Sequence, residues 1–544
     1  MPKPTLTEKL SEIRRQEEEL RTKDLAEKLN LPYLNLFALP IDPGGLKIIA
    51  EETARKANLI VLQKQDKKLQ IALVDPKNLA TQKVLEDLKK QGFNYSLFLV
   101  SNSGLKKALT HYQEITLIGE EITGQIGISP QLISQLQKEI KNLDDLRKKI
   151  NQLTGVQISK LLEIMIAGAL NLDASDIHLE PKEKNTHLKY RLDGLLHQVV
   201  FLSNKTYNLA LPRIKLLSGM KLNIRDVAQD GRFTIRLEKI DIEVRASVIP
   251  GAYGENIVLR ILNPKTISLD LKDLGFRQED LEIIEQQTKK PNGLIITTGP
   301  TGSGKTTTLY AFLKKTAKPE IKIITLEDPI EYHLEGITQT QVESEVGYTF
   351  AAGLRAILRQ DPDVILVGEI RDKETAEIAI NASLTGHLVF STLHTNDAAG
   401  AIPRFIDLGA KPGVLAASLN LIMAQRLVRQ LCQKCKKEYK PAKEILEKIK
   451  KALEGVDDKV IEGGRFYQAK GCAQCNKTGY KGRVAILEMI VIDQDLEKLV
   501  TLSPSHVQVS EFSHKKGLLT MYQDGLLKVL SGITTLEELE RVVG

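Results

Sequence analysis

The sequence predicts an α/β protein of several domains, the last of which is built on a parallel β-sheet. Three observations indicate this. Apolar strands alternate with helical stretches from residue 266 onward, a hairpin between Phe233 and Val248 shows period-2 alternation, and 544 residues exceed what one hydrophobic core usually supports. Hydrophobic residues make up 42% and charged residues 27%, which excludes a mainly disordered or collagen-like chain.

Residues 1–115 are expected to form a small α/β or α+β domain. Leucines at roughly helical spacing predict a surface helix over residues 5–30, and a second helical pattern covers residues 78–90. Short apolar runs predict strands at 59–62, 69–74 and 95–100. The first residues are charged, so we expect no secretory signal, and the sequence has no apolar run long enough to span a membrane.

Residues 116–155 are interpreted as a linker, because glycines break its first half and a polar helix follows. Residues 156–265 form a second domain, in which an apolar helix precedes strands at 187–192, 195–202 and 256–262 and the hairpin. Residues 266–544 form the C-terminal domain, with buried strands at 294–298, 321–326, 364–367 and 388–391.

A phosphate-binding loop follows the first strand of the C-terminal domain. The run GPTGSGKT at 299–306 fits the G-x-x-x-x-G-K-[ST] pattern, in which backbone N–H groups surround phosphate oxygens at the start of a helix. The predicted nucleotide-binding residues are Gly299, Pro300, Thr301, Gly302, Ser303, Gly304, Lys305, Thr306 and Thr307. Lys305 is expected to bridge the β- and γ-phosphates of ATP, and Thr306 to contact Mg²⁺.

Carboxylates end two strands of this sheet. Glu327 and Asp328 follow one strand, and Glu369 follows another. The carboxyl ends of parallel strands face the ligand, so these acids are expected to meet the triphosphate and its Mg²⁺. The Mg²⁺-associated residues are predicted to be Thr306, Asp328 and Glu327. The alternative is that one of these acids only caps a helix.

Two histidines flank the strand at 388–391. His387 and His394 are candidates for sensing or polarising the γ-phosphate, although hydrogen-bonded core histidines are an equal alternative. With them, the predicted catalytic set is Glu369, Glu327, Lys305, His394 and His387.

Four cysteines form two matched C-x-x-C pairs, Cys432 with Cys435 and Cys472 with Cys475. Four thiolates at this spacing predict a closed, tetrahedral and structural Zn²⁺ site, and a redox pair is the alternative. A zinc-binding subdomain is therefore expected at about residues 430–485.

Together these motifs resemble those of the type IV pilus assembly and type II secretion ATPases. The matching stretches are ASDIHLEP (174–181), YRLDG (190–194), QDGR (229–232), GPTGSGKTTTLY (299–310), ITLEDPIEY (324–332), LRAILRQDPDVILVGEIRD (354–372), ASLTGHLVFSTLHTNDA (382–398) and GCAQCNKTGYKGR (471–483). They cover most of residues 150–490 and occur in the order of the family.

The resemblance implies a RecA-like P-loop ATPase domain preceded by a PAS-like second domain and a partner-docking N-terminal domain. It implies a homo-hexamer in which the second domain of one subunit contacts the ATPase domain of the next. It also implies a cytoplasmic location at the inner face of the cell membrane. Arg191, Arg213 and Arg232 are the arginines that the resemblance suggests act in trans; for most of the many arginines in this domain a solvated surface is the simpler interpretation.

The implied function is a motor that uses ATP hydrolysis to polymerise pilin through an inner-membrane platform protein. The alternative is the type II secretion motor, which has the same chemistry. A nucleotide-gated scaffold and a DNA translocase are less consistent with these motifs, and no nucleic-acid partner is expected.

The N-terminal domain is expected to dock on an adaptor of the membrane complex. Relatives that bind a cyclic dinucleotide do so through an Arg-Leu-Gly motif, which residues 1–60 lack, so the sequence does not support such binding.

Overall fold

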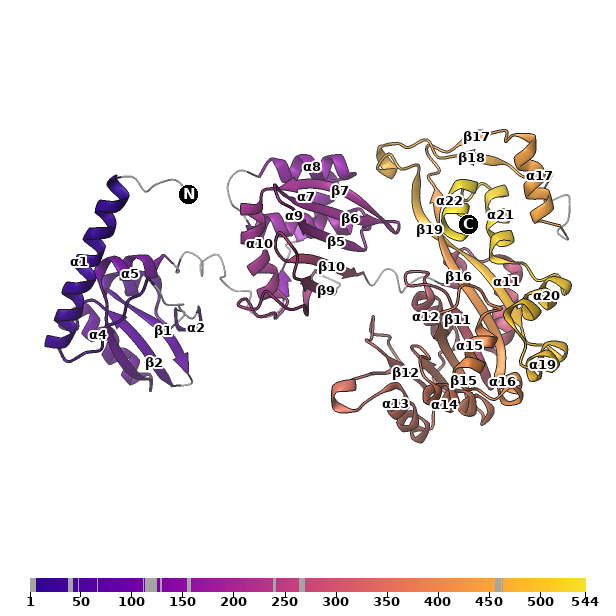
Figure 1. The fold of residues 1–544 in the computed structure, drawn as a ribbon, viewed down its shortest axis with the longest axis horizontal. Helices are drawn as coiled ribbons and strands as arrows, with labels where there is room; N and C mark the ends of the chain where they lie inside the picture. Colours follow the sequence, from indigo (N-terminus) through magenta and orange to yellow (C-terminus); the bar gives the residue numbers. More distant parts are fainter. Residues whose placement is uncertain are drawn as a thin grey trace. The chain divides into compact units, whose positions relative to one another are not determined.

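The computed structural model describes residues 6–37, 43–46, 48–65, 67–110, 112, 125–127, 130–153, 158–237, 241–263, 270–454, 461 and 463–544. The chain divides into two compact units, residues 1–123 and 124–544 (Figure 1). Among the described residues, no helix combines the length and apolar character needed to cross a bilayer.

The first unit packs helices around a three-stranded sheet of order β1-β2-β3. Its strands are β1 (Leu59–Gln65), β2 (Lys68–Leu73) and β3 (Asn94–Leu99), and its helices are α1 (Leu6–Lys28), α2 (Pro43–Leu46), α3 (Glu51–Lys56), α4 (Leu79–Lys90) and α5 (Asn102–Leu109). Strand β2 pairs antiparallel with β1 and parallel with β3. Glu19 fixes α1 to this unit, because its carboxylate accepts hydrogen bonds from Tyr33 (2.5 Å) and Ser101 (2.6 Å).

Residues 130–151, which the sequence analysis placed in the linker, fold as two helices of the second unit. These are α7 (Pro130–Glu139) and α8 (Leu143–Asn151), and they pack against α9 (Ile158–Asn171). Leu146 of α8 is fully buried, and a Cβ on Gly168 of α9 would lie only 2.6 Å from its Cδ1. The two helices therefore contribute to the hydrophobic core of the second domain. The remaining residues of the predicted linker, apart from the short β4, lie outside the described residues or beside these helices.

The second domain contains a seven-stranded sheet of order β4-β8-β9-β10-β5-β6-β7. The strands are β4 (Gln125–Gly127), β5 (Asp176–Pro181), β6 (Thr186–Leu192), β7 (Leu195–Leu202), β8 (Gln229–Arg236), β9 (Asp241–Ile249) and β10 (Asn256–Leu262), with helix α10 (Asn204–Leu217). All pairs are antiparallel except β4 with β8. Alternate residues of β9 are buried, as the period-2 pattern predicts.

The C-terminal domain has a seven-stranded sheet of order β13-β12-β14-β15-β11-β16-β19. Its strands are β11 (Gly293–Thr298), β12 (Ile323–Glu327), β13 (Thr338–Gln341), β14 (Val364–Val367), β15 (Leu388–Leu393), β16 (Leu419–Leu431) and β19 (Tyr480–Val491). Only β19 runs antiparallel to its neighbour. The predicted parallel sheet is present.

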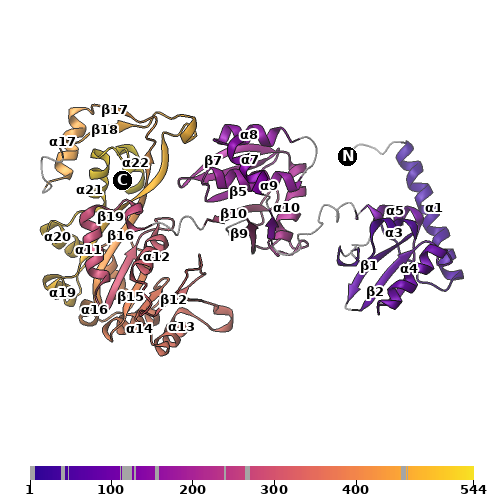
Figure 2. The ribbon, with the colours of Figure 1, turned by 180° about the vertical axis from the view of Figure 1, so that it is seen from behind.

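Helices cover both faces of this sheet, as Figures 1 and 2 show. The helices of the domain are α11 (Gln278–Thr288), α12 (Lys305–Thr316), α13 (Phe350–Ile357), α14 (Lys373–Leu384), α15 (Ala401–Asp407), α16 (Pro412–Ser418), α17 (Lys443–Ala452), α19 (Gln494–Thr501), α20 (His506–Lys515), α21 (Met521–Leu530) and α22 (Leu536–Val543). Ile295 and Phe390 pack with α11 and α12, whereas Ile296 and Val389 pack with α13 and α14. Successive residues of these strands thus pack into hydrophobic clusters on opposite faces of the sheet, so the strands are buried on both faces.

A small subdomain extends from strands β16 and β19. It contains β17 (Lys437–Tyr439), which pairs with β18 (Phe466–Gln468), and helix α17. Strand β16 leads directly into Cys432, and β19 begins shortly after Cys475.

Candidate nucleotide-binding and zinc sites

The phosphate loop connects the carboxyl end of β11 to the first turn of α12. Gly299, Gly302 and Gly304 adopt φ values of 143°, 80° and 90°, which residues with a Cβ rarely adopt. Ser303 is 4% exposed, and among the described residues its hydroxyl has no hydrogen-bond partner. An orphaned hydroxyl inside a glycine loop at a helix N-terminus fits a phosphate group.

Lys305 stands at the start of α12 and folds back over the loop. Its ammonium group donates to the carbonyl oxygens of Gly299 (2.7 Å) and Pro300 (3.1 Å). Burial lowers the pKa of Lys305, and the nearby Glu369 carboxylate opposes this shift. The Lys305 ammonium group therefore lies against the loop and is attracted by Glu369, which follows β14.

A cleft of about 780 Å³ opens over this loop. It falls in the size range of small-molecule sites. Its lining brings together Thr301, Gly302, Ser303, Gly304, Lys305, Thr306, Thr307, Glu327, Asp328, Glu369 and His394. Most of the predicted site residues therefore share one cleft.

Glu327 ends β12 and is 3% exposed. Its Oε1 accepts hydrogen bonds from Thr325 (2.6 Å) and Gln339 (3.1 Å), and its Oε2 accepts one from Tyr310. Burial, reinforced by the Glu327 carboxylate, raises the pKa of Tyr310, so this hydroxyl remains a donor. Three donors fix Glu327 in place beside the cleft.

Asp328 and Thr306 are exposed residues on the cleft wall. A carboxylate and a hydroxyl are hard oxygen ligands, which are the ligands that Mg²⁺ prefers. The donor chemistry of this part of the cleft therefore fits a magnesium ion accompanying a triphosphate.

Glu369 and His394 form a pair at the ends of two adjacent strands. Glu369 follows β14 and His394 follows β15, and His394 Nε2 lies 3.2 Å from Glu369 Oε2. The other Glu369 oxygen contacts the Arg371 guanidinium group. The Glu369 side chain is 12% exposed, so it is held by two partners at the edge of the cleft.

His387 lies at the amino-terminal end of β15, whereas the phosphate loop lies at the carboxyl ends of the parallel strands. It precedes β15, its carbonyl oxygen accepts from Gly293 at the start of β11, and its Nδ1 faces the Ala382 carbonyl oxygen (3.0 Å). A six-residue strand spans roughly 20 Å, so His387 cannot reach a phosphate bound at the other end. The structure therefore places His394, but not His387, in the cleft of its own chain, and the contact of His387 with Ala382 fits the hydrogen-bonded alternative.

Of the three arginines suggested to act in trans, only Arg191 lines the cleft of its own chain. Arg213 is half-buried on α10 and Arg232 is exposed on β8. The cleft instead includes Arg260 of β10, which the sequence analysis did not single out. Asp176, 3% exposed, contacts two of the cleft arginines: its Oδ1 is 2.9 Å from Arg260 Nε and its Oδ2 is 3.2 Å from Arg191 Nε. In the sequence, Asp176 stands in the mixed strand DIHLEP, which gives no local signal for this contact.

A second contact from the same domain reaches the loop after β12. Arg245 of β9 pairs with Glu331 (2.8 Å) and donates to the Ile330 carbonyl oxygen (2.5 Å). Burial raises the pKa of Glu331, and Arg245 and Arg260 oppose this shift. The loop that carries Asp328 is therefore held by a cation of the second domain.

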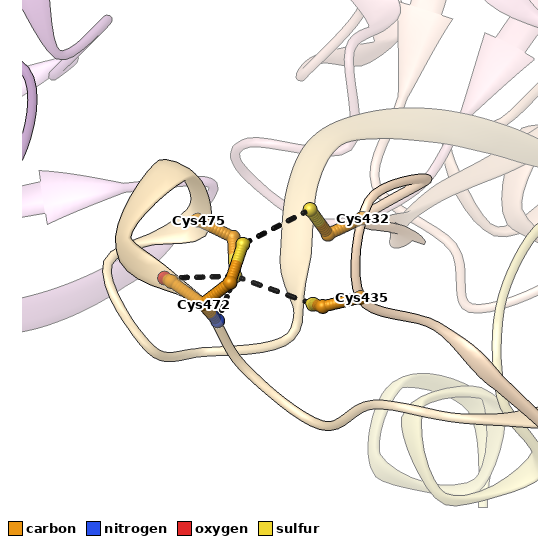
Figure 3. Close-up of side chains that lie close together, drawn as sticks. All are labelled: Cys432, Cys435, Cys472 and Cys475. Atoms are coloured by element: carbon orange, nitrogen blue, oxygen red, sulfur yellow. Dashed lines mark hydrogen bonds between the residues drawn. The ribbon is translucent and has the colours of Figure 1, made fainter.

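The four cysteines converge at the tip of the small subdomain (Figure 3). The Sγ atoms of Cys432 and Cys472 are 3.9 Å apart, those of Cys435 and Cys475 3.7 Å, and those of Cys472 and Cys475 3.7 Å. Tetrahedral Zn–S bonds of about 2.3 Å require sulfurs about 3.8 Å apart. Backbone N–H groups of Cys472 and Gly479 also donate to Cys475 Sγ and hold this sulfur in place within the cluster. The arrangement fits a structural zinc ion with no open position.

The phosphate loop on a parallel sheet, with carboxylates at the ends of neighbouring strands, defines a P-loop ATPase. The family model described as "Type II/IV secretion system protein" matches residues 152–541, which is more than half of the chain, and the chain belongs to this family. A second model, the "MshEN domain", matches residues 29–118. The predicted family is confirmed.

Three curated relatives illustrate the similarity. The type IV pilus assembly ATPase PilB of Thermus thermophilus is 38% identical over 94% of this chain, which spans 56% of that relative's length. PilB of Myxococcus xanthus is 37% identical over 96% of this chain and 90% of its own length. Type II secretion system protein E of Pseudomonas aeruginosa is 42% identical over 79% of this chain and 84% of its own length.

The X-ray structure of the ATPase DotB of Legionella pneumophila resembles this chain with a TM-score of 0.51. The match covers 70% of this chain and 95% of DotB at 22% sequence identity, and therefore shows the fold alone. It confirms the predicted α/β fold with a parallel-containing sheet.

The MshEN match bears on the N-terminal domain. It covers residues 29–118, which include part of the stretch 1–60 that lacks the Arg-Leu-Gly motif.

Proposed function

We propose that the protein is a motor ATPase that drives type IV pilus assembly, working as a homo-hexamer against an inner-membrane platform protein at the cytoplasmic face of the membrane. The observation that carries this proposal is the cleft in which the phosphate loop, Glu369 and His394 meet. An intact phosphate loop beside a paired carboxylate favours turnover over a nucleotide-gated scaffold.

Each cleft residue receives a role from its surroundings. The Lys305 cation would move from the loop carbonyls to the β- and γ-phosphates when ATP binds. Glu369, with one oxygen toward His394, would orient and deprotonate the attacking water. Thr306 and Asp328 would hold the magnesium ion, which neutralises phosphate charge when bound. Glu327 accepts from three side chains and would shape this part of the cleft.

The arginines are proposed to complete the site between subunits. Arg191 and Arg260 project over the cleft of their own chain, held by Asp176. Arg232 is exposed on β8 and is therefore accessible to a neighbouring copy. A cation delivered to the γ-phosphate in this way would couple hydrolysis to the contact between subunits.

Pilus assembly is placed first because the two PilB relatives cover 94% and 96% of the chain, slightly more than the 92% covered by type II secretion system protein E of Aeromonas hydrophila. The type II secretion motor is the second candidate, and the 42% identity to protein E of P. aeruginosa favours it. The catalytic chemistry is the same in both.

The test is a chromosomal Lys305→Ala substitution in the source cell. Hydrolysis is expected to fall to background, because no other cation stands inside the loop at that point. Surface filaments are then counted by electron microscopy, and secreted proteins are blotted. Loss of filaments with normal secretion supports pilus assembly, trapped cargo with intact filaments supports the secretion motor, and undiminished ATPase activity contradicts both.

For the N-terminal domain we propose docking on an adaptor of the membrane complex. The MshEN match also supports a direct test with cyclic di-GMP by calorimetric titration of the full chain. Saturable binding would make this domain a receptor, and absent binding would leave docking as its role.

A further inference from the structure

Gln425 lies directly beneath the phosphate loop. It belongs to β16, which runs parallel to β11 with Ala424 paired to Thr298, so Gln425 is level with Gly299 at the start of the loop. The side chain is 1% exposed, although it carries both a donor and an acceptor. A buried carboxamide in this position requires partners on both of its atoms.

Both partners belong to the nucleotide-binding segment. The Gln425 Nε2 group donates to the Ser303 carbonyl oxygen (3.0 Å), and the Thr308 hydroxyl donates to Gln425 Oε1 (2.8 Å). Ser303 is in the loop and Thr308 is in the first turns of α12. One side chain from a neighbouring strand thus joins the loop to the helix that follows it.

The bond to Ser303 sets the direction of a peptide plane. In a trans peptide the C=O and N–H groups point in opposite directions. Because the Ser303 carbonyl is turned toward Gln425, the N–H of Gly304 is turned away from β16, toward the side of the loop where phosphate oxygens bind. Gln425 therefore acts on a group of the phosphate cradle.

Two of the loop glycines fit closely against this residue. A Cβ on Gly304 would lie 2.8 Å from Gln425 Nε2, and one on Gly299 would lie 2.5 Å from the Gln425 backbone oxygen. At Gly302, by contrast, a Cβ would meet nothing within 4 Å. The close approach of β16 thus contributes to the glycine requirement at the two ends of the loop.

We propose that Gln425 is a positioning residue for ATP binding: it holds the Ser303–Gly304 peptide in the orientation that binds phosphate. This inference rests on the proposed ATP-binding role of the cleft. It assigns a function to a strand that carries no part of the phosphate-loop motif.

The test compares two substitutions of an amide by a carboxylate on the same strand, in the full-length protein. Gln425→Glu keeps the side-chain size but replaces the donor to Ser303 by an oxygen. Asn420→Asp is the matched control, because Asn420 is also buried on β16 and donates to a backbone carbonyl oxygen, that of Asn292 (2.9 Å). Asn420 lies near the start of the strand, at the end away from the phosphate loop.

Gln425→Glu is expected to raise the Kd of a fluorescent ATP analogue and the KM for ATP about tenfold, with kcat at saturating ATP within about threefold of wild type, because misaligned donors weaken nucleotide binding most directly. Asn420→Asp is expected to lower Tm and leave Kd and KM unchanged. An unchanged Kd in Gln425→Glu, or an equal rise in both variants, overturns the proposal.

Thr308→Val keeps the proposal testable if Gln425→Glu does not fold. It removes only the hydroxyl that fixes Gln425 Oε1, and we expect a rise in Kd of about threefold; an unchanged Kd overturns the proposal. If the wild-type protein itself binds no ATP analogue, the proposed function fails, which is a different result from equal binding by wild type and variants.

Discussion

At the scale of single residues, the surroundings of Glu369 distinguish a residue for hydrolysis from the residues that would bind the nucleotide. Lys305 and the loop glycines would hold phosphate, whereas Glu369 follows β14, which β15 separates from β11, with His394 on one oxygen and Arg371 on the other. Its two partners fix the carboxylate without burying it completely. A residue placed in this way is expected to act on water and to contribute little to nucleotide affinity.

Glu369→Gln tests this separation. The amide keeps the size of the side chain but cannot accept a proton, so we expect hydrolysis to fall at least about 100-fold while the Kd for ATP stays within about threefold. Steady-state ATPase assays and nucleotide titrations measure the two quantities. Glu374→Gln is the control, because Glu374 is an exposed acid paired with Arg355. A loss of nucleotide binding in Glu369→Gln would instead assign Glu369 to the magnesium ion.

At the scale of elements, Glu538 attaches α22 to β16. Its buried carboxylate accepts hydrogen bonds from the Arg429 backbone N–H (3.0 Å) and guanidinium group (2.7 Å) and from Arg541 (2.8 and 2.7 Å). Burial alone would raise the pKa of Glu538, but these hydrogen bonds lower it from 4.5 to about 2. The last helix is therefore held to the sheet by an ionised acid.

Glu538→Gln is expected to destabilise the protein in a pH-dependent way. The folded pKa lies below the unfolded value of 4.5, so the contribution of Glu538 is complete above about pH 4.5 and is lost as the pH falls toward 2. The difference in unfolding free energy between wild type and variant is about 3 kcal/mol at pH 7 and decreases below pH 4.5. Urea unfolding at several pH values measures it.

The control for this series is Glu537→Gln, which changes an exposed acid on the same helix. It is expected to shift the urea midpoint little at any pH. A Glu538→Gln effect that persists unchanged at pH 3 would contradict the role of the ionised carboxylate.

The zinc site gives a second prediction at this scale. Cys472→Ser removes one of four ligands, so stoichiometric zinc is expected to disappear and the segment 432–480 to become sensitive to proteolysis, because metal affinity in such sites is folding energy. Elemental analysis and limited proteolysis measure the two effects, and Thr478→Ser in the same segment is the control. Wild-type protein without zinc and with an unchanged melting curve after chelation would refute the site.

At the scale of the whole molecule, the sequence predicted the parallel sheet because strands buried on both faces produce continuous apolar runs. It also predicted most of the cleft, since the phosphate loop and the acids at strand ends are local signals. The failures depend on long-range contacts. His387 was grouped with His394 although the two residues flank one strand, and only His394 follows the carboxyl end of β15, where the cleft opens.

Other residues were missed because their role depends on neighbours distant in sequence. Gln425 carries no motif of its own and reaches the loop only because β16 pairs with β11. The helices at 130–151 are amphipathic and polar overall, so their sequence resembles that of a connector. In the structure, their apolar residues pack against α9. Arg260 was one of many arginines, and its place in the cleft and its contact with Asp176 are visible only in the structure.

The pairing of β16 with β19 has a consequence for strand register. Strand β16 ends at Leu431, next to Cys432, and β19 starts shortly after Cys475, so a bound metal would link the two strands at this end of their long antiparallel pair. A slip of one residue would turn every side chain of β16 to the other face and carry Gln425 away from the loop. By fixing the register of β16 against β19, the four cysteines would thus help to keep Gln425 beside the glycines of the phosphate loop.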